Sequence, residues 1–126
     1  MKVRVYYHDT DCGGVVYYAN YLKYMEQART EFLESRQINM KALVEQGTYF
    51  VVAHQEIDYK LPARYGDILE ISSRLIKIST VKLEYEHEVN NQNGQLVCKG
   101  KAVLVCVDSS IKPKAIPEDI KSKLGG

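Results

Sequence analysis

The sequence predicts a single α+β domain, residues 1–126, in which one long helix packs on an antiparallel sheet. Apolar residues repeat with a helical period between residues 17 and 36, and with strand patterns from residue 49 to 107. A helix-rich segment followed by consecutive strands is typical of a sheet that packs on the apolar face of one main helix. A chain of 126 residues can bury a real core in one domain.

The first third of the chain is expected to form a strand and two helices. Apolar and polar residues alternate at the start, through Val3, Val5 and Tyr7, as in a half-buried strand. The helix predicted over residues 17–36 places Tyr21, Met25, Ala28 and Phe32 on one face. Asn20 is a candidate cap for this helix. A short second helix, residues 40–46, is expected to end at Gly47.

Four strands are predicted next, over residues 49–59, 68–78, 81–89 and 95–107. The sequence Asn93-Gly94 between the last two is typical of a hairpin turn. The last strand is apolar on both faces over residues 102–107, which predicts an interior position in the sheet. Residues 118–124 are expected to form a short terminal helix.

Composition excludes several classes of function. A net charge of +1 does not favour nucleic acid or an anionic membrane as the main partner. No stretch has the length and hydrophobicity of a signal region or membrane span. The three cysteines are not paired in spacing, and the three histidines form no ligand cluster with them. We therefore expect a reduced, cytoplasmic protein that needs no metal and no redox cofactor.

The segment between the first strand and the long helix carries the candidate chemistry. Its sequence is Asp9-Thr10-Asp11-Cys12-Gly13-Gly14, and the glycine pair permits a tight turn into the helix. The start of a helix offers unpaired N–H groups and a partial positive charge, so a carboxylate beside it suits acyl or anion chemistry. Taken alone, the string is also compatible with simple Asx turns.

Many residues, in the right order, resemble the hotdog-fold acyl-CoA thioesterases. The resemblance is to the 4-hydroxybenzoyl-CoA thioesterase family and, within it, to the YbgC-like, Tol-Pal-associated subgroup. It covers nearly the whole chain. The segments that carry it are Arg4-Val5-Tyr6-Tyr7-His8-Asp9-Thr10-Asp11, Gly13-Gly14-Val15-Val16-Tyr17, Ala19-Asn20-Tyr21, Glu26-Gln27-Ala28-Arg29-Thr30-Glu31, Pro62-Ala63-Arg64, Val103-Leu104-Val105-Cys106-Val107-Asp108 and Lys112-Pro113-Lys114-Ala115-Ile116-Pro117.

The resemblance implies a fold, an assembly and a set of site residues. The fold would be a long central helix wrapped by a curved antiparallel sheet, with protomers paired edge to edge into homodimers or homotetramers. The active site would lie at the dimer interface. The family's catalytic carboxylate falls on Asp11, its oxyanion-binding N–H on Tyr18, and a nearby tyrosine on Tyr7. We expect Asp9 to form a turn.

One departure from the YbgC pattern matters for the site, beside Cys12, which stands where a small residue is more usual. Those enzymes usually have a histidine where this chain has Tyr18, whereas the hydroxybenzoyl-CoA enzymes have a tyrosine. A role for a histidine side chain is therefore not carried over, but the N–H role needs no particular side chain. Gly14, Arg64, Lys112 and Lys114 are expected at the substrate, the three basic residues as ligands of the coenzyme A phosphates.

The expected reaction is hydrolysis of a short-chain or aromatic acyl-CoA to the free acid and CoA, with Asp11 as nucleophile or general base. Three alternatives remain. A hydroxyacyl-carrier dehydratase would use a histidine paired with an acid, which the helix start lacks. A hotdog scaffold would hold a partner such as acyl-carrier protein with little turnover. Cys12 beside His8 would be a thiol nucleophile, although no third orienting group is apparent.

Overall fold

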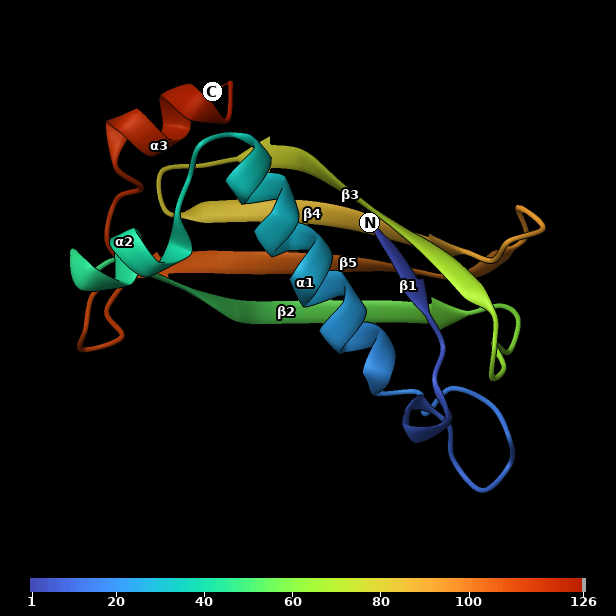
Figure 1. Cartoon of the computed structure of the whole chain (residues 1–126). Helices are drawn as coiled ribbons and strands as arrows, with labels where there is room; N and C mark the ends of the chain where they lie inside the picture. Colours follow the sequence, from blue (N-terminus) through green and yellow to red (C-terminus); the bar gives the residue numbers. More distant parts are fainter. Residues whose placement is uncertain (126) are drawn as a thin grey trace.

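The computed structural model describes residues 1–125 and consists of one antiparallel sheet and three α-helices (Figure 1). The five strands lie in the order β1-β3-β4-β5-β2. The elements in chain order are β1 Lys2–Arg4, the 3-10 helix η1 Tyr7–Asp9, α1 Asn20–Ser35, α2 Met40–Glu45, β2 Tyr49–Tyr59, β3 Ile68–Ile78, β4 Lys82–Asn90, β5 Leu96–Val107 and α3 Glu118–Lys123.

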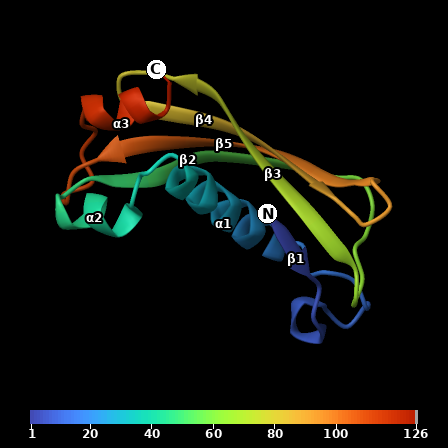
Figure 2. The same ribbon diagram turned by 45° about the horizontal axis from the view of Figure 1, so that its top comes forward.

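Helix α1 crosses one face of the sheet, which curves around it (Figure 2). The helix buries a stripe at three- and four-residue spacing, comprising Tyr21, Tyr24, Met25, Ala28, Arg29 and Leu33. Burial of this stripe against the sheet holds the two layers together. The expected architecture, a long helix wrapped by a curved antiparallel sheet, is confirmed.

The core lies between α1 and the sheet and has two parts. Tyr21 and Met25 in the first half of α1 pack with residues of β1, β3 and the start of β5. Leu33 near the end of α1 packs with α2, α3 and the middle of the sheet, including Tyr85. A Cβ at Gly100 of β5 would lie 2.8 Å from the Glu56 carbonyl oxygen and 3.1 Å from the Met25 side chain. The absence of a side chain there allows α1 to approach the sheet closely.

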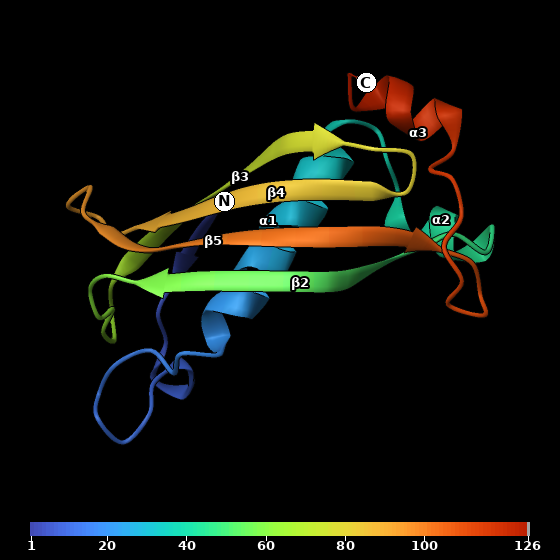
Figure 3. The same cartoon turned by 180° about the vertical axis from the view of Figure 1, so that it is seen from behind.

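The two ends of the sheet carry different loops. The segment from residue 5 to 19 lies beside the end of β2, near the start of α1 (Figures 1 and 3). The segment after β5, residues 108–117, lies at the opposite end, beside α2. Strand β5 is an interior strand, as predicted, and β2 is an edge strand.

The predicted element order is confirmed, with two local differences. The first strand ends at Arg4, so Tyr7 lies in the short 3-10 helix η1 rather than in a strand. Asn20 is the first residue of α1 instead of its cap, and its side-chain amide donates to the Asp9 carbonyl over 2.8 Å. Asn20 thus fastens the helix to the preceding loop. Within residues 1–125, no helix is long and apolar enough to cross a membrane.

Candidate active site

The loop that carries Asp11 is a closed, hydrogen-bonded turn. The Asp11 N–H donates to the Val15 carbonyl over 2.9 Å, and the Gly14 N–H donates to the Asp11 carbonyl over 3.0 Å. Gly14 has a φ of 78°, which residues with a Cβ rarely adopt. Gly14 therefore makes the turn, and its N–H is already used by the loop itself.

The Asp11 carboxylate lies at the surface with one oxygen engaged. Its Oδ1 accepts the Gly13 N–H over 2.8 Å. A Cβ on Gly13 would lie 3.1 Å from the same oxygen, so a larger residue would require the carboxylate to shift by a few tenths of an ångström. The Oδ2 atom accepts no hydrogen bond from residues 1–125, and the side chain is exposed. One oxygen of Asp11 is held, and the other has no hydrogen-bond partner within residues 1–125.

The start of α1 presents free N–H groups. The Tyr17 carbonyl accepts the Asn20 N–H over 2.9 Å. Because the peptide is planar and trans, the Tyr18 N–H points in the opposite direction, out of the helix start. It has no acceptor within the described part of the chain. An N–H in this position, at the positive end of the helix dipole, is suited to an oxyanion.

Tyr17 lies within electrostatic range of Asp11 and next to Tyr18. The Tyr18 hydroxyl, then burial, and last the charge of the Asp11 carboxylate raise the pKa of Tyr17. The rings of Tyr17 and Tyr18 lie 4.9 Å apart between centroids. The loop thus brings Asp11 to the same end of the molecule as the Tyr18 peptide.

Asp9 differs from Asp11 in its contacts. Its Oδ2 accepts the Tyr6 N–H over 2.8 Å, and its carbonyl accepts the Tyr17 N–H over 2.9 Å. Its charge contributes, after burial, to the raised pKa of the Tyr24 hydroxyl. These contacts are those of a turn-former, in agreement with the expectation for Asp9.

Tyr7 and Arg64 also lie near the loop, although they come from different parts of the chain. Tyr7 is 81% exposed, its ring meets Tyr65 edge-on, and it forms no hydrogen bond with Asp11 among the described residues. Arg64 pairs through its backbone with Val15 of the loop, and its side chain is exposed. Both lie at the same end of the molecule as the Asp11 loop.

Lys112 and Lys114 are not brought to this loop within one protomer. They lie in the segment after β5, at the opposite end of the sheet (Figure 3). The Lys114 ammonium donates to the Thr48 hydroxyl over 2.8 Å, whereas Lys112 is exposed. A single chain therefore carries the expected site residues in two separate groups.

Two tyrosines at the site were not identified from the sequence. Tyr59 and Tyr65 are 49% and 60% exposed. The ring of Tyr65 contacts Tyr7, and the ring of Tyr59 contacts Tyr18, which in turn contacts Tyr17. Their positions at the end of β2 and in the following turn gave no periodic signal. Large exposed aromatic groups gathered at one place are typical of binding surfaces.

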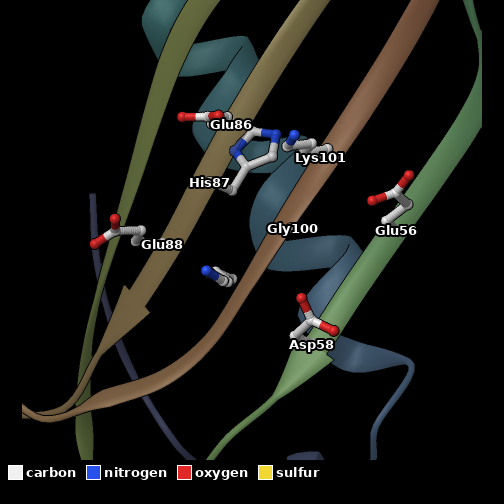
Figure 4. A pocket seen from close by; sticks show the side chains of 8 residues that line it. Glu56, Asp58, Glu86, His87, Glu88, Gly100 and Lys101 are labelled. Atoms are coloured by element: carbon white, nitrogen blue, oxygen red, sulfur yellow. The ribbon is translucent and has the colours of Figure 1, made fainter.

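A separate cavity of about 320 Å³ lies on the face of the sheet away from α1. It is lined by charged side chains of β2, β4 and β5, among them Glu56, Glu86 and Lys101 (Figure 4). Opposite charges are adjacent in the strand register, which pairs Lys101 with both glutamates. This is a polar sheet surface on which four carboxylates outnumber two lysines, and it does not include Asp11.

Comparison with known proteins gives one family. The thioesterase-like superfamily matches residues 5–124. The acyl-CoA thioester hydrolase YbgC of Escherichia coli O6:H1 is 39% identical over 119 residues, which cover 94% of this chain and 89% of that protein.

Two solved structures from Thermus thermophilus are similar along nearly the whole chain. A hypothetical protein is 30% identical with a TM-score of 0.93, covering 99% of this chain and 95% of that one. A thioesterase complexed with coenzyme A and zinc is 34% identical with a TM-score of 0.83, covering 98% and 88%.

Proposed function

This chain belongs to the thioesterase-like superfamily and is a thioester hydrolase, and from that premise we propose that it hydrolyses acyl-CoA with Asp11 as the reacting carboxylate. The main support for this role is the hydrogen bonding of the Asp11 carboxylate. One carboxylate oxygen is fixed by the Gly13 N–H, and the other has no partner in residues 1–125. A short-chain or aromatic acyl group is the proposed substrate class.

The proposed chemistry needs few groups, because a thiolate leaves readily. In one route, the free oxygen of Asp11 attacks the thioester carbon, the C–S bond breaks, and water hydrolyses the resulting anhydride. In the other, Asp11 takes a proton from a water molecule that attacks the same carbon, after which the C–S bond breaks and the thiolate leaves. In both routes negative charge develops on the carbonyl oxygen, and the Tyr18 N–H would stabilise it. Loss of one such donor typically costs about 3 kcal/mol in the transition state.

The second group of site residues is proposed to come from a second copy of the chain. Strand β2 is an edge, and the exposed tyrosines lie beside its Tyr59 end. Antiparallel pairing of two β2 edges about a two-fold axis would place the Tyr49 end of one protomer beside the Tyr59 end of the other. The Lys112 segment, which flanks the Tyr49 end, would then approach the partner's Asp11 loop.

Coenzyme A would lie across this interface. Arg64 next to the Asp11 loop, with Lys112 and Lys114 from the other protomer, are the proposed ligands of its phosphates. The exposed tyrosines and the pairing edge would exclude water from the thioester. A homodimer is thus the smallest assembly proposed to be active, and a homotetramer would pair two such dimers.

A turnover assay tests the proposal. The purified protein is given acyl-CoA substrates of increasing chain length and an aromatic acyl-CoA, and thiol release is followed. We expect release by the wild type and a loss of two or more orders of magnitude in kcat for Asp11→Asn. Asp119→Asn, an exposed carboxylate on α3, is the matched control and should retain activity. Full activity in Asp11→Asn would overturn the role of Asp11, and absence of turnover in the wild type would favour a scaffold that binds acyl-carrier protein.

A further inference from the structure

Tyr59, the last residue of the edge strand β2, connects the sheet to the start of α1. Its hydroxyl donates to the Tyr18 carbonyl oxygen over 3.2 Å. Its ring lies 5.8 Å from the ring of Tyr21, which is buried in the core, and 6.5 Å from that of Tyr18. A half-exposed side chain therefore makes a hydrogen bond and two aromatic contacts at one point, the first turn of the helix.

The hydrogen bond from Tyr59 fixes a peptide that α1 itself does not hold. The Tyr18 carbonyl accepts no other hydrogen bond among residues 1–125, and Asn20 is the first residue assigned to the helix. Ala19, at the cap position, provides no side-chain hydrogen bond. The orientation of the Tyr18–Ala19 peptide thus depends on the hydroxyl of Tyr59.

Two successive peptides are fixed in this way. The Tyr17–Tyr18 peptide is held through its carbonyl by the Asn20 N–H, and the Tyr18–Ala19 peptide by Tyr59. Because each peptide is planar and trans, the N–H groups of Tyr18 and Ala19 point away from these acceptors. Neither N–H has an acceptor in the described chain. Asn20 therefore orients the Tyr18 N–H and Tyr59 orients the Ala19 N–H, so that both free donors of the helix start have a defined direction.

We propose that Tyr59 is a positioning residue that holds the Tyr18–Ala19 peptide so that the helix start can bind the oxyanion of the thioester. The inference rests on the proposed function, since it takes the helix start as the oxyanion site. The buried ring of Tyr21 supports the Tyr59 ring, and the Tyr59 hydroxyl supports the peptide. Donors that are already oriented need no reorganisation when charge develops, which is the basis of this form of catalysis.

The test is Tyr59→Phe, which removes the hydroxyl and keeps the ring on Tyr21. Loss of one such hydrogen bond predicts a fall in kcat of about fivefold to tenfold. The KM for acyl-CoA should stay within about twofold, because the donors act mainly on the transition state. The shape of the pH–rate profile should not change. Tyr85→Phe, which removes a hydroxyl that has no partner in the core, is the matched control and should leave kcat unchanged.

A second readout does not need turnover. Without the Tyr59 hydroxyl the first turn should open more often, so the Asn20 amide should exchange with deuterium faster in Tyr59→Phe than in the wild type. An unchanged kcat in Tyr59→Phe would overturn the proposal, whatever the exchange rate of the Asn20 amide. A rise in KM alone would assign Tyr59 to substrate binding, and an altered pH profile would assign it to proton transfer; both contradict a positioning role.

The outcomes separate this proposal from the proposed function. If the wild type releases no thiol from any acyl-CoA, the proposed function fails, and the exchange of Asn20 still reports whether Tyr59 holds the helix start. If the wild type is active and Tyr59→Phe is equally active, only the positioning role fails. Tyr59→Leu, which also removes the contact with Tyr21, should lower kcat and the melting temperature together.

Discussion

The guanidinium of Arg29 lies against the ring of His87 inside the core, with 3.4 Å between Nη1 and Nε2. Both side chains are almost fully buried, Arg29 on α1 and His87 on β4. The other ring nitrogen of His87 lies 2.9 Å from the Ser73 hydroxyl. No carboxylate within residues 1–125 forms a salt bridge with Arg29. A buried cation thus has a neutral imidazole as its partner.

The first prediction concerns the stability of the protein in acid. Burial, and next the charge of Arg29, lower the pKa of His87 from 6.5 to about 4. Between pH 6.5 and about 4, His87 therefore stays mostly neutral in the folded protein, whereas it is mostly protonated in the unfolded chain. Stability from this group is complete above pH 6.5 and is lost as the pH falls towards about 4. A shift of this size corresponds to about 3 kcal/mol, measured as the free energy of unfolding in urea at a series of pH values.

Two variants make that measurement specific to His87. In His87→Asn the group no longer titrates, so the pH dependence between 6.5 and about 4 should become shallower than in the wild type. His8→Asn, which replaces a histidine with an 83% exposed side chain, should keep the wild-type slope. Equal slopes in the wild type and His87→Asn would contradict the prediction.

Arg29→Met tests the electrostatic contact itself. Methionine fills a similar volume without a charge, so the pKa of His87 should rise towards its ordinary value, while burial keeps it below that value. An NMR titration of the His87 ring measures the change. Removal of a buried charge that lacks a carboxylate partner should leave the free energy of unfolding unchanged or raise it by about 1 kcal/mol. An unchanged His87 pKa would show that burial alone accounts for the shift.

The contact between Arg29 and His87 could be predicted only in part from sequence patterns. The helical period identified the apolar face of α1, because burial of that face drives the packing of the layer. The same pattern gives no reason for an arginine to lie on it, and Arg29 was not predicted to be buried. His87 follows the strand alternation and was expected in the sheet, but its partner depends on where α1 crosses β4. That crossing is a property of the packed layers rather than of either segment.

The candidate site could likewise be predicted only in part from the sequence. Local chemistry predicted the Asp11 turn, since the glycines and aspartates act within a few residues of each other. Tyr59 was not predicted, because its contact with Tyr18 joins residues 41 positions apart. Lys112 was expected at the coenzyme A phosphates from the resemblance, and the fold of one chain places it at the end of the sheet opposite Asp11. Contacts between distant segments need the three-dimensional arrangement.

Gly13→Ala should disturb the candidate carboxylate without disturbing the fold. The new Cβ would lie 3.1 Å from Asp11 Oδ1, so the carboxylate must move by a few tenths of an ångström. Misplacement of a reacting group on this scale is expected to lower kcat by about tenfold, because the reaction depends on near-attack geometry. The melting temperature should change little, since both residues are exposed. Steady-state kinetics and a thermal melt measure the two effects.

Cys12→Ala in the same loop is the control for that variant and also tests the thiol alternative. Cys12 is exposed and forms no disulfide. If Asp11 is the reacting group, the substitution should preserve kcat while Gly13→Ala lowers it. Loss of turnover in Cys12→Ala, with Asp11→Asn still active, would assign the reaction to the thiol.

The last prediction tests whether one active site draws on two chains. Lys112→Glu should raise the KM for acyl-CoA through repulsion of its phosphates, so this variant should be nearly inactive at low substrate concentration. Asp11→Asn should be nearly inactive because it lacks the reacting carboxylate. In a mixed dimer, the Asp11 of one chain would meet the intact Lys112 segment of the other. Random pairing makes half of the dimers mixed, each with one intact site, so co-expression should restore about a quarter of the wild-type activity. The two chains carry different affinity tags, so mixed dimers can be purified and assayed directly. If the site lay within one chain, a mixed dimer would contain no intact site, and its activity would stay at the level of the two variants measured separately.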